Sequence, residues 1–459
     1  MRETPRKSPG RITLTCAAAF VCAAAALVLP QLLPFAATTA YAQSAKTKKA
    51  SAAKTAPAKT ESGTPQAPAP AQAGKFPPRT PFTAADDAVA TIPGMPDVRF
   101  FADQTTEFTK ALPAQPGPWL ILSTGGADGA FGAGLVTGLS AGGHRPEFSV
   151  VTGVSAGALM APFMFAGPKY DAALQALYTQ TSAADIFEVG STGESFLDTW
   201  PLRDLIKKQI TPELLADIAT AYKNGRRLFI VTTDLDAERS VVWNMGAIAV
   251  HAADPGKDGG AALDLFRRVL LASSSIPGAF PPVQIDVEGN GKHFSEMHVD
   301  GGVGGQFFVA PPALMESTSG YKIPATQLYV VINSGLQPEF DVVERATPSI
   351  LAQSVGMAVK TDLRLMLDRA FVAAKNSGIG FNVASIPTDF SAPSRGAFDP
   401  AYMKALFQTG FELGKSGNAF ADRPPPYPGQ SAPSSGTPSS SQSNTTTDKG
   451  LSTDPGASK

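Results

Sequence analysis

The pattern Gly153-Val-Ser155-Ala-Gly157 puts a serine between two small residues, in the spacing of a nucleophile elbow. The apolar run 148–152 before it predicts a short buried strand, and the run 156–165, rich in Ala, Leu and Met, predicts a helix. A serine at such a turn projects its hydroxyl beside a helix N-terminus, where developing negative charge is favoured. The segment therefore predicts a nucleophile. The alternative is a Gly/Ser/Ala-rich turn without chemistry.

A glycine-rich segment follows another expected strand, 119–123, and precedes the serine in the chain. It contains Gly125, Gly126, Ala127 and Gly129. Glycines after a strand leave backbone N–H groups free to bind an anion, either a nucleotide phosphate or an oxyanion. The spacing matches neither the dinucleotide-binding pattern nor the Walker pattern. We therefore expect the N–H groups of Gly125, Gly126 and Ala127 to form an oxyanion hole.

A serine hydroxyl is a weak nucleophile and needs a nearby base to activate it. The chain has four histidines, and none follows His298, where an α/β-hydrolase would have its catalytic histidine. A Ser-His-Asp esterase that uses His251 or His298 with an upstream acid remains an alternative. If 296–300 is a strand, His298 and Asp300 share one face, with Asp300 at the end of the strand.

Four segments, in this order, resemble the motifs of patatin-like phospholipases: the loop 124–129, the elbow 153–157, Ala272-Ser-Ser-Ser-Ile-Pro277-Gly-Ala-Phe-Pro281, and Val299-Asp300-Gly301-Gly302. The resemblance covers roughly residues 115 to 420. It implies a three-layer α/β/α fold with a mostly parallel central sheet, and hydrolysis of acyl esters in lipids. It implies Ser155 as nucleophile and Asp300 as its direct base, with no metal and no cofactor. The motif glycines are Gly129, Gly153, Gly157, Gly301 and Gly302.

Such a dyad makes demands on the aspartate, because a carboxylate in water is a poor base for an alcohol. We expect Asp300 to be largely buried and within hydrogen-bond reach of Ser155. The chain also departs from the family, whose loop usually has glycine at the position of Thr124 and a basic residue at the position of Asp128. Without the basic side chain of the family loop, a preference for phospholipids is less expected, whereas ester hydrolysis is still expected. Asp128 is expected to be a solvated loop acid or an acid at a helix start.

Strands alternate with helices between the two ends of the chain, which predicts one α/β domain with active residues at the carboxyl ends of strands. Two expected helices, 349–374 and 400–414, carry Leu, Met and Phe side chains such as Leu363, Leu367 and Met403. These side chains would either pack in the core or line a pocket for an acyl chain. The segment 185–200 lacks strong periodicity and is a candidate for a mobile lid.

The N-terminal residues 1–42 read as an export signal, with a basic start, an apolar stretch 12–29 and an Ala40-Tyr-Ala42 cleavage site. An uncleaved membrane anchor is the alternative. Residues 43–79 are expected to be a disordered linker, 80–422 the hydrolase domain and 423–459 a disordered tail, because both flanking segments lack large apolar residues. We therefore expect an exported protein, periplasmic or secreted.

Charge and cysteine content limit the partners. The net charge of −1 gives no basic excess for binding nucleic acid. Both cysteines, Cys16 and Cys22, lie in the expected signal, so no disulfide is expected. The expected partners are a lipid or acyl-ester substrate and, transiently, a membrane surface. A metal site built from His293, Glu296, His298 and Asp300 lacks the spacing of a helical metal motif. A non-catalytic effector or binding protein on the same fold is the remaining alternative.

Overall fold

The computed structural model describes residues 76–190, 192–254, 256 and 258–427. Of these, the residues up to Pro424 belong to one compact unit. The expected signal 1–42 and most of the expected linker 43–79 and tail 423–459 lie outside the described residues, so those boundaries stay predictions. Among the described helices, none combines the length and the apolar character needed to cross a membrane.

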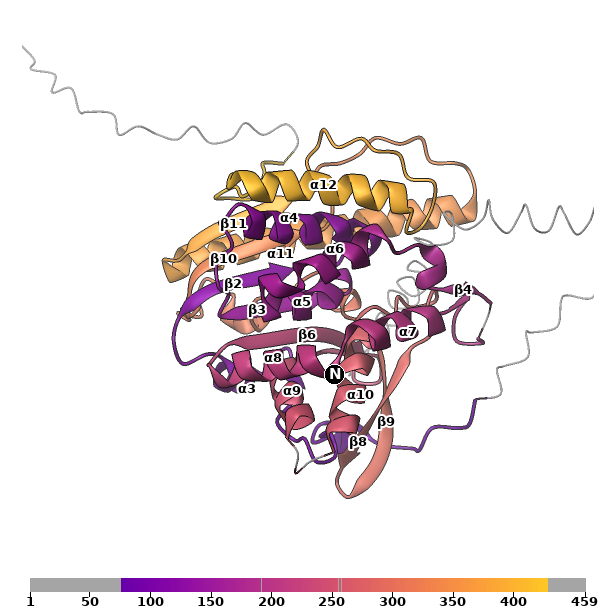
Figure 1. Ribbon diagram of the computed structural model, residues 1–459. Helices are drawn as coiled ribbons and strands as arrows, with labels where there is room; N and C mark the ends of the chain where they lie inside the picture. The colour runs from indigo at the N-terminus through magenta and orange to yellow at the C-terminus, as the bar shows by residue number, and fades with distance from the viewer. Residues whose placement is uncertain (1–75, 191, 255, 257, 428–459) are drawn as a thin grey trace, which may run out of the picture. The chain divides into compact units, whose positions relative to one another are not determined.

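A nine-stranded sheet forms the middle layer, and five of its neighbouring strands run parallel, in the order β6-β3-β2-β10-β11 (Figure 1). These strands are β2 (Gly117–Leu122), β3 (Val150–Val154), β6 (Arg227–Asp234), β10 (Ala325–Ile332) and β11 (Gly380–Ser385). Antiparallel strands extend the sheet beyond β6: β7 (Arg239–Asn244), then β1 (Arg99–Phe101), and the hairpin of β8 (Val283–Gly289) and β9 (Lys292–Asp300). A separate small hairpin joins β4 (Glu188–Val189) and β5 (Leu197–Asp198).

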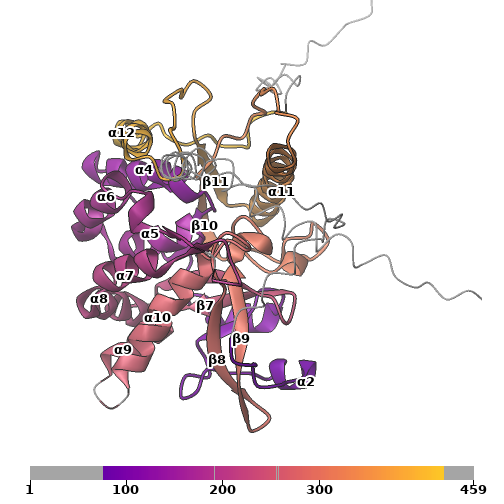
Figure 2. The same ribbon diagram turned by 90° about the vertical axis from the view of Figure 1, so that its right-hand side faces the viewer.

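Helices cover both faces of the sheet, and Figure 2 shows α11 on the side opposite to α4, α5, α7 and α8. The larger group comprises α4 (Gly129–Ala141), α5 (Ala156–Ala166), α6 (Asp171–Thr179), α7 (Trp200–Gln209), α8 (Pro212–Lys223), α9 (Met245–Ala253), α10 (Gly259–Ser273) and α12 (Pro400–Ser416). The other face carries α11 (Thr347–Ser377) and α3 (Thr105–Ala111). Helix α2 (Ala84–Asp87) lies against β8. Short 3-10 turns are η1 (Gly126–Asp128), η2 (Pro168–Tyr170), η3 (Ala183–Asp185), η4 (Gly301–Val303) and η5 (Pro312–Leu314).

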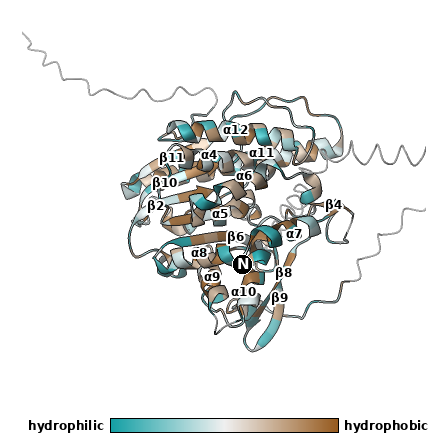
Figure 3. Ribbon diagram, viewed as in Figure 1, coloured by the Kyte–Doolittle hydropathy of each residue, from teal (hydrophilic) through white to brown (hydrophobic). Residues whose placement is uncertain are grey.

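The three layers follow from the apolar character of the central strands, which are mainly brown in Figure 3. Leu120 and Leu122 of β2 belong to the core under α4 and α5, whereas Trp119 and Ile121 belong to the core under α11. Because successive side chains of a strand point to opposite faces, a strand that is apolar at every position needs cover on both sides. The predicted α/β/α fold with a mostly parallel central sheet is confirmed.

Helix α12 packs closely against α4, and glycines lie at the points of closest contact. A Cβ atom at Gly134 would lie 2.0 Å from the carbonyl oxygen of Phe407, and one at Gly410 would lie 2.2 Å from that of Phe131. Larger side chains would therefore separate the two helices. This close approach fixes the N-terminal end of α4, which follows the glycine-rich loop.

The structure adds detail to two segments considered from the sequence. The strand expected at 148–152 is β3, which begins and ends two residues later because Phe148 and Ser149 belong to the connection before it. The segment 185–200, a candidate for a mobile lid, contains the β4–β5 hairpin and buries Ile186 and Leu197. Its apolar side chains therefore contribute to the core, which the missing periodicity did not reveal.

Candidate active site

Ser155 lies at the turn between β3 and α5 and has a strained backbone. Its φ of 56° and ψ of −121° fall in a region that residues with a Cβ atom rarely adopt. A Cβ at Gly153 would lie 2.4 Å from the carbonyl oxygen of Gly157, and one at Gly157 would lie 2.5 Å from that of Leu122. Both positions therefore require glycine, as the elbow pattern predicts.

Ser273 holds this turn from the end of α10. Its Oγ accepts the backbone N–H of Ser155 at 3.0 Å and donates to the carbonyl oxygen of Val231 at 2.7 Å. No role was predicted for Ser273 from the sequence, although it lies in the motif 272–281. The only indication in the sequence was a run of three serines after an apolar helix. The role of Ser273 depends on the packing of α10 beside β6, which the sequence does not show.

Asp300 ends β9 and faces Ser155. Its Oδ2 accepts the hydroxyl hydrogen of Ser155 at 2.7 Å, and its Oδ1 accepts the backbone N–H of Gly302 at 2.7 Å. Burial raises the pKa of Asp300 to about 7, and the two hydrogen bonds act in the opposite direction. Both expectations for Asp300, burial and hydrogen-bond reach of Ser155, agree with this geometry. A carboxylate of raised pKa is better matched to accept a proton from an alcohol.

The glycines after Asp300 let three segments meet. A Cβ at Gly301 would lie 2.3 Å from the carbonyl oxygen of Val231, and one at Gly302 would lie 2.8 Å from Cγ2 of Thr124. The Gly-Gly turn thus packs the end of β9 against β6 on one side and against the glycine-rich loop on the other.

The expected oxyanion loop lies at the carboxyl end of β2. Gly125 touches the backbone of Asn333, where a Cβ would lie 2.6 Å from the carbonyl oxygen. Gly126 and Ala127 open η1, and N–H groups in the first turn of a helix have no partner within that helix. Of the three expected donors, Gly126 lines the same cavity as Ser155. Gly129 begins α4, and a Cβ there would lie 2.8 Å from the ring of Tyr178.

Asn333 is a further site residue that the sequence analysis missed. Its Nδ2 donates to the carbonyl oxygen of Ser123 at 3.0 Å, and its Oδ1 accepts the N–H of Gly132 at 3.1 Å. The side chain thereby ties the start of the glycine-rich loop to α4. Asn333 directly follows β10, and a polar residue at the end of an apolar run was the only available signal.

Of the two expectations for Asp128, a solvated loop acid or an acid at a helix start, the structure agrees with the second. Asp128 is the N-terminal cap position of α4. Its Oδ1 accepts the hydroxyl hydrogen of Tyr402 at 2.7 Å. Burial raises its pKa to about 6, and the hydrogen bond with Tyr402 acts in the opposite direction.

A narrow cavity of about 70 Å³ opens beside Ser155 and is almost entirely apolar. Helices α5, α6, α7 and α10 supply most of its walls, including Leu159, Leu177, Leu205, Ile206 and Leu270. Of the helical side chains considered for an acyl pocket, Met403 lines this cavity, whereas Leu363 and Leu367 pack in the core on the other face of the sheet.

The histidines do not join Ser155 in the described part of the chain. His298 is completely buried, and its ring nitrogens contact Thr232 Oγ1 at 2.9 Å and Glu296 Oε2 at 3.1 Å. His293 is exposed on the β8–β9 hairpin, and His251 lies in α9. The only carboxylate or imidazole that the hydroxyl of Ser155 contacts among the described residues is Asp300.

Part of the chain is similar to known proteins. Residues 120–312 match a family model described as patatin-like phospholipase, which confirms the resemblance. No curated protein matches the sequence. The crystal structure of VipD from Legionella pneumophila is 12% identical, with 66% of this chain and 67% of that chain covered and a TM-score of 0.33. The type III effector protein ExoU is 15% identical, with 67% of this chain and 54% of that chain covered and a TM-score of 0.26.

Proposed function

We propose that this chain, which carries a patatin-like phospholipase domain over residues 120–312, is an exported serine hydrolase that cleaves acyl esters of lipids with the dyad Ser155–Asp300. The single observation that carries the proposal is the 2.7 Å hydrogen bond from Ser155 Oγ to Asp300 Oδ2. This hydrogen bond joins a nucleophile on a strained turn to a buried base. Ser155 also lines an apolar cavity.

In the first half of the reaction, Ser155 Oγ attacks the ester carbonyl carbon while Asp300 Oδ2 takes the hydroxyl proton. The carbonyl π electrons move to the oxygen, which becomes an oxyanion. The N–H groups of the loop Gly125, Gly126 and Ala127 stabilise that charge, because donors fixed in a water-poor site need no reorganisation. When the tetrahedral intermediate collapses, the C–O bond to the alcohol breaks, and Asp300 returns its proton to the leaving alkoxide.

In the second half, a water molecule replaces the alcohol. Asp300 accepts one proton of this water as its oxygen attacks the acyl-enzyme carbonyl carbon. Collapse of the second intermediate breaks the bond to Ser155 Oγ, which recovers the proton from Asp300, and the fatty acid leaves. The residues named here perform every proton transfer, so the scheme requires neither a metal nor a cofactor.

The cavity beside Ser155 supports a substrate with a single apolar chain at the reacting carbonyl. Its walls are apolar side chains from several helices, and burying a methylene group contributes about 0.8 kcal/mol. The loop position that the family gives to a cation is Asp128, whose carboxylate is engaged by Tyr402. We therefore propose uncharged or zwitterionic esters rather than anionic headgroups as substrates.

Membrane contact is proposed for the segment that precedes and begins α11. Phe340 is 95% exposed and Met357 is 70% exposed, and Val342 and Ile350 between them are exposed as well. Helix α11 approaches the glycine-rich loop through Gln306, whose N–H donates to Met366 Sδ at 3.3 Å and whose Oε1 accepts the hydroxyl hydrogen of Thr124 at 2.7 Å. Large apolar side chains at such a surface insert into the headgroup boundary of a lipid layer. Export rests on the expected signal 1–42, which lies outside the described residues.

The proposal is tested with the purified mature chain on two substrates, a monomeric acyl ester and phosphatidylcholine vesicles. Wild type should release fatty acid from both, and Ser155→Ala should release none. Phe340→Ser should lower the rate on vesicles alone, whereas Val89→Ser, at an exposed position near β8, should change neither rate. If folded wild type releases no fatty acid from either substrate, the hydrolase proposal fails and the alternative of a non-catalytic effector is favoured.

A further inference from the structure

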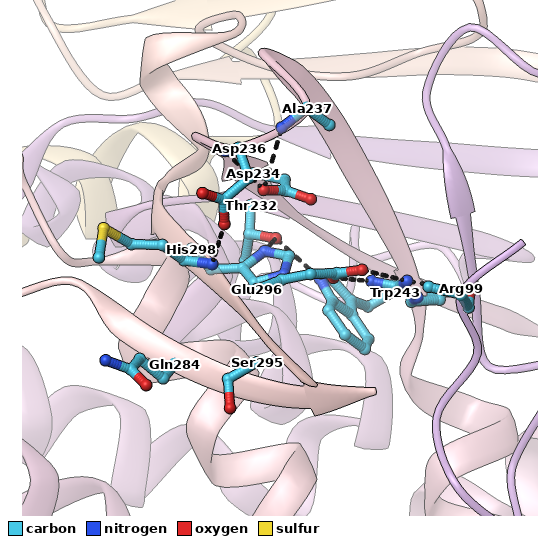
Figure 4. Close-up of polar contacts among 12 residues, drawn as sticks. Arg99, Thr232, Asp234, Asp236, Ala237, Trp243, Gln284, Ser295, Glu296 and His298 are labelled. Atoms are coloured by element: carbon cyan, nitrogen blue, oxygen red, sulfur yellow. Dashed lines mark hydrogen bonds and ion pairs between the residues drawn. The ribbon is translucent and has the colours of Figure 1, made fainter. Parts of the chain in front are cut away.

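A second group of polar side chains is buried between β6 and β9, beyond the dyad. Asp234 and His298 are direct partners on these two antiparallel strands, and Glu296 lies two residues before His298 on the same face (Figure 4). All three residues are completely buried. One ligand atom from each, a carboxylate oxygen or an imidazole nitrogen, lies within 4.8 Å of the other two.

One carboxylate oxygen of Asp234 has no hydrogen-bond partner among the described residues. Its Oδ1 accepts the backbone N–H of Asp236 at 2.9 Å and of Ala237 at 3.4 Å, so the turn after β6 fixes the carboxylate. This leaves Oδ2, which is buried, as the oxygen without a partner in the described part of the chain. A buried carboxylate oxygen without a partner is costly, because desolvation is not offset by any contact.

The charges around this oxygen do not balance. Asp87, Asp234 and Glu296 bring three carboxylates together, and Asp87 also has a buried oxygen without a hydrogen-bond partner in the described chain. Arg99 neutralises Glu296 by pairing with both of its oxygens. Neither Asp87 nor Asp234 forms an ion pair with an arginine or lysine among the described residues, and a divalent cation would supply a positive partner.

The geometry points to a site for one divalent transition-metal ion, held by Asp234 Oδ2, Glu296 and His298. We propose Zn²⁺ as its occupant, because a mixed set of imidazole and carboxylates suits zinc, whereas magnesium and calcium prefer oxygen ligands alone. His298 Nε2 and Glu296 Oε2 are joined by a hydrogen bond of 3.1 Å, and an ion bound between these two atoms would replace that hydrogen bond. A water molecule would complete the coordination.

The surroundings of His298 suit a metal ligand. Thr232 Oγ1 lies 2.9 Å from Nδ1 and can accept its hydrogen, which leaves the lone pair of Nε2 for the ion. Trp243 Nε1 donates to the same Thr232 Oγ1 at 2.8 Å and holds it in place. Bound there, the ion would join β6 to β9 by a link that takes no part in ester hydrolysis. The candidate metal site considered from the sequence contained Glu296 and His298 but not Asp234, which lies more than sixty residues before His298.

The test uses the full purified chain and Zn²⁺ alone. We expect wild type, stripped with a chelator and dialysed, to take up one equivalent of Zn²⁺ in competition with a chromophoric chelator, and to unfold at a higher temperature once loaded. In Asp234→Asn, the affinity should fall about 100-fold or more and the rise in unfolding temperature should vanish. Asp286→Asn removes an exposed acid from the same hairpin and should bind as wild type does.

Substitution of Co²⁺ gives a second readout that does not depend on stability. Loaded wild type should show visible d–d absorption, and Asp234→Asn should not. The proposal is overturned if folded, stripped wild type takes up no Zn²⁺, or if Asp234→Asn binds Zn²⁺ as tightly as wild type. Because Zn²⁺ uptake is measured without any ester, a failure here leaves the proposed hydrolase intact.

Discussion

Ser155 Oγ and Asp300 Oδ2 lie 2.7 Å apart in a site where both residues are almost completely buried. The two atoms come from positions that are 145 residues apart in the chain, and the β3–α5 turn and the end of β9 bring them together. The second oxygen of Asp300 is held by the N–H of Gly302, which orients Oδ2 toward the serine. This arrangement gives the first prediction.

Replacing Asp300 by Asn should abolish most turnover and leave the fold intact. The amide keeps the size of the carboxylate and the contact with Gly302, but it cannot accept the proton of Ser155. A positioned general base contributes about 10²–10⁴-fold, so kcat should fall by that factor. Initial rates on a monomeric ester and far-ultraviolet circular dichroism check both parts. Full activity of a folded Asp300→Asn variant would remove Asp300 from the mechanism.

Gly157→Ala should destabilise the protein, because its new Cβ would lie 2.5 Å from the carbonyl oxygen of Leu122. Overpacking of this kind costs about 1–3 kcal/mol of the free energy of unfolding. Gly190→Ala is the matched control, since a Cβ at Gly190 has no atom within 4 Å. Urea unfolding of both variants measures the difference. Equal stabilities would show that the elbow tolerates a side chain at position 157.

Asp128→Asn should stabilise the protein at neutral pH and have little effect in acid. The folded-state pKa of Asp128 is raised to about 6, so its contribution to stability is complete below about pH 4 and is lost as the pH rises through 6. Asparagine resembles the protonated acid at every pH and can still accept the hydrogen bond from Tyr402. We expect a gain of about 1–2 kcal/mol at pH 7.5 and almost none at pH 4.

Unfolding curves of wild type and Asp128→Asn at the two pH values provide the measurement. Asp286→Asn, an exposed acid on β8, controls for the general loss of a negative charge. A gain that is the same at pH 4 and pH 7.5 would contradict the raised pKa of Asp128.

Leu205→Phe should shorten the acyl chains that the enzyme accepts. Leu205 lines the cavity beside Ser155 and is only partly buried, so a larger side chain can enter the cavity. Loss of contact with one or two methylene groups lowers kcat/KM by about 10- to 200-fold. We expect such a loss on dodecanoyl esters and little change on acetyl esters. Leu365→Phe, at an exposed position of α11, should leave the ratio unchanged. Parallel losses on both chain lengths would contradict the assignment of the cavity to the acyl chain.

The sequence predicted the parts of the fold that depend on local pattern. Apolar strands such as β2 and β10 and the Gly-x-Ser-x-Gly turn have strong local signals, and the resemblance to patatin-like phospholipases supplied the layer order. Asp300 was identified through that resemblance, because an Asp-Gly pair alone is typical of an ordinary turn. Ser273 and Asn333 were missed, since their roles depend on contacts with segments more than 100 residues away.

The environment of ionisable groups was the least predictable feature. The hydrogen bond between Asp128 and Tyr402 was not predicted, because the two residues are 274 positions apart in the chain. No sequence pattern marked Asp234 as a site residue. It lies opposite His298 only because β6 pairs with β9. Long-range pairing of this kind is set by tertiary packing, which no local pattern encodes.

The most direct test of the central claim is labelling of the active-site serine. The purified mature chain is treated with a fluorophosphonate, and the adduct is mapped by peptide mass spectrometry, with Asp300→Asn treated in parallel. We expect one adduct per chain, on Ser155, and much slower formation of this adduct in Asp300→Asn. A folded wild-type sample that forms no adduct, or forms it on another residue, would contradict the assignment of Ser155 as the activated nucleophile.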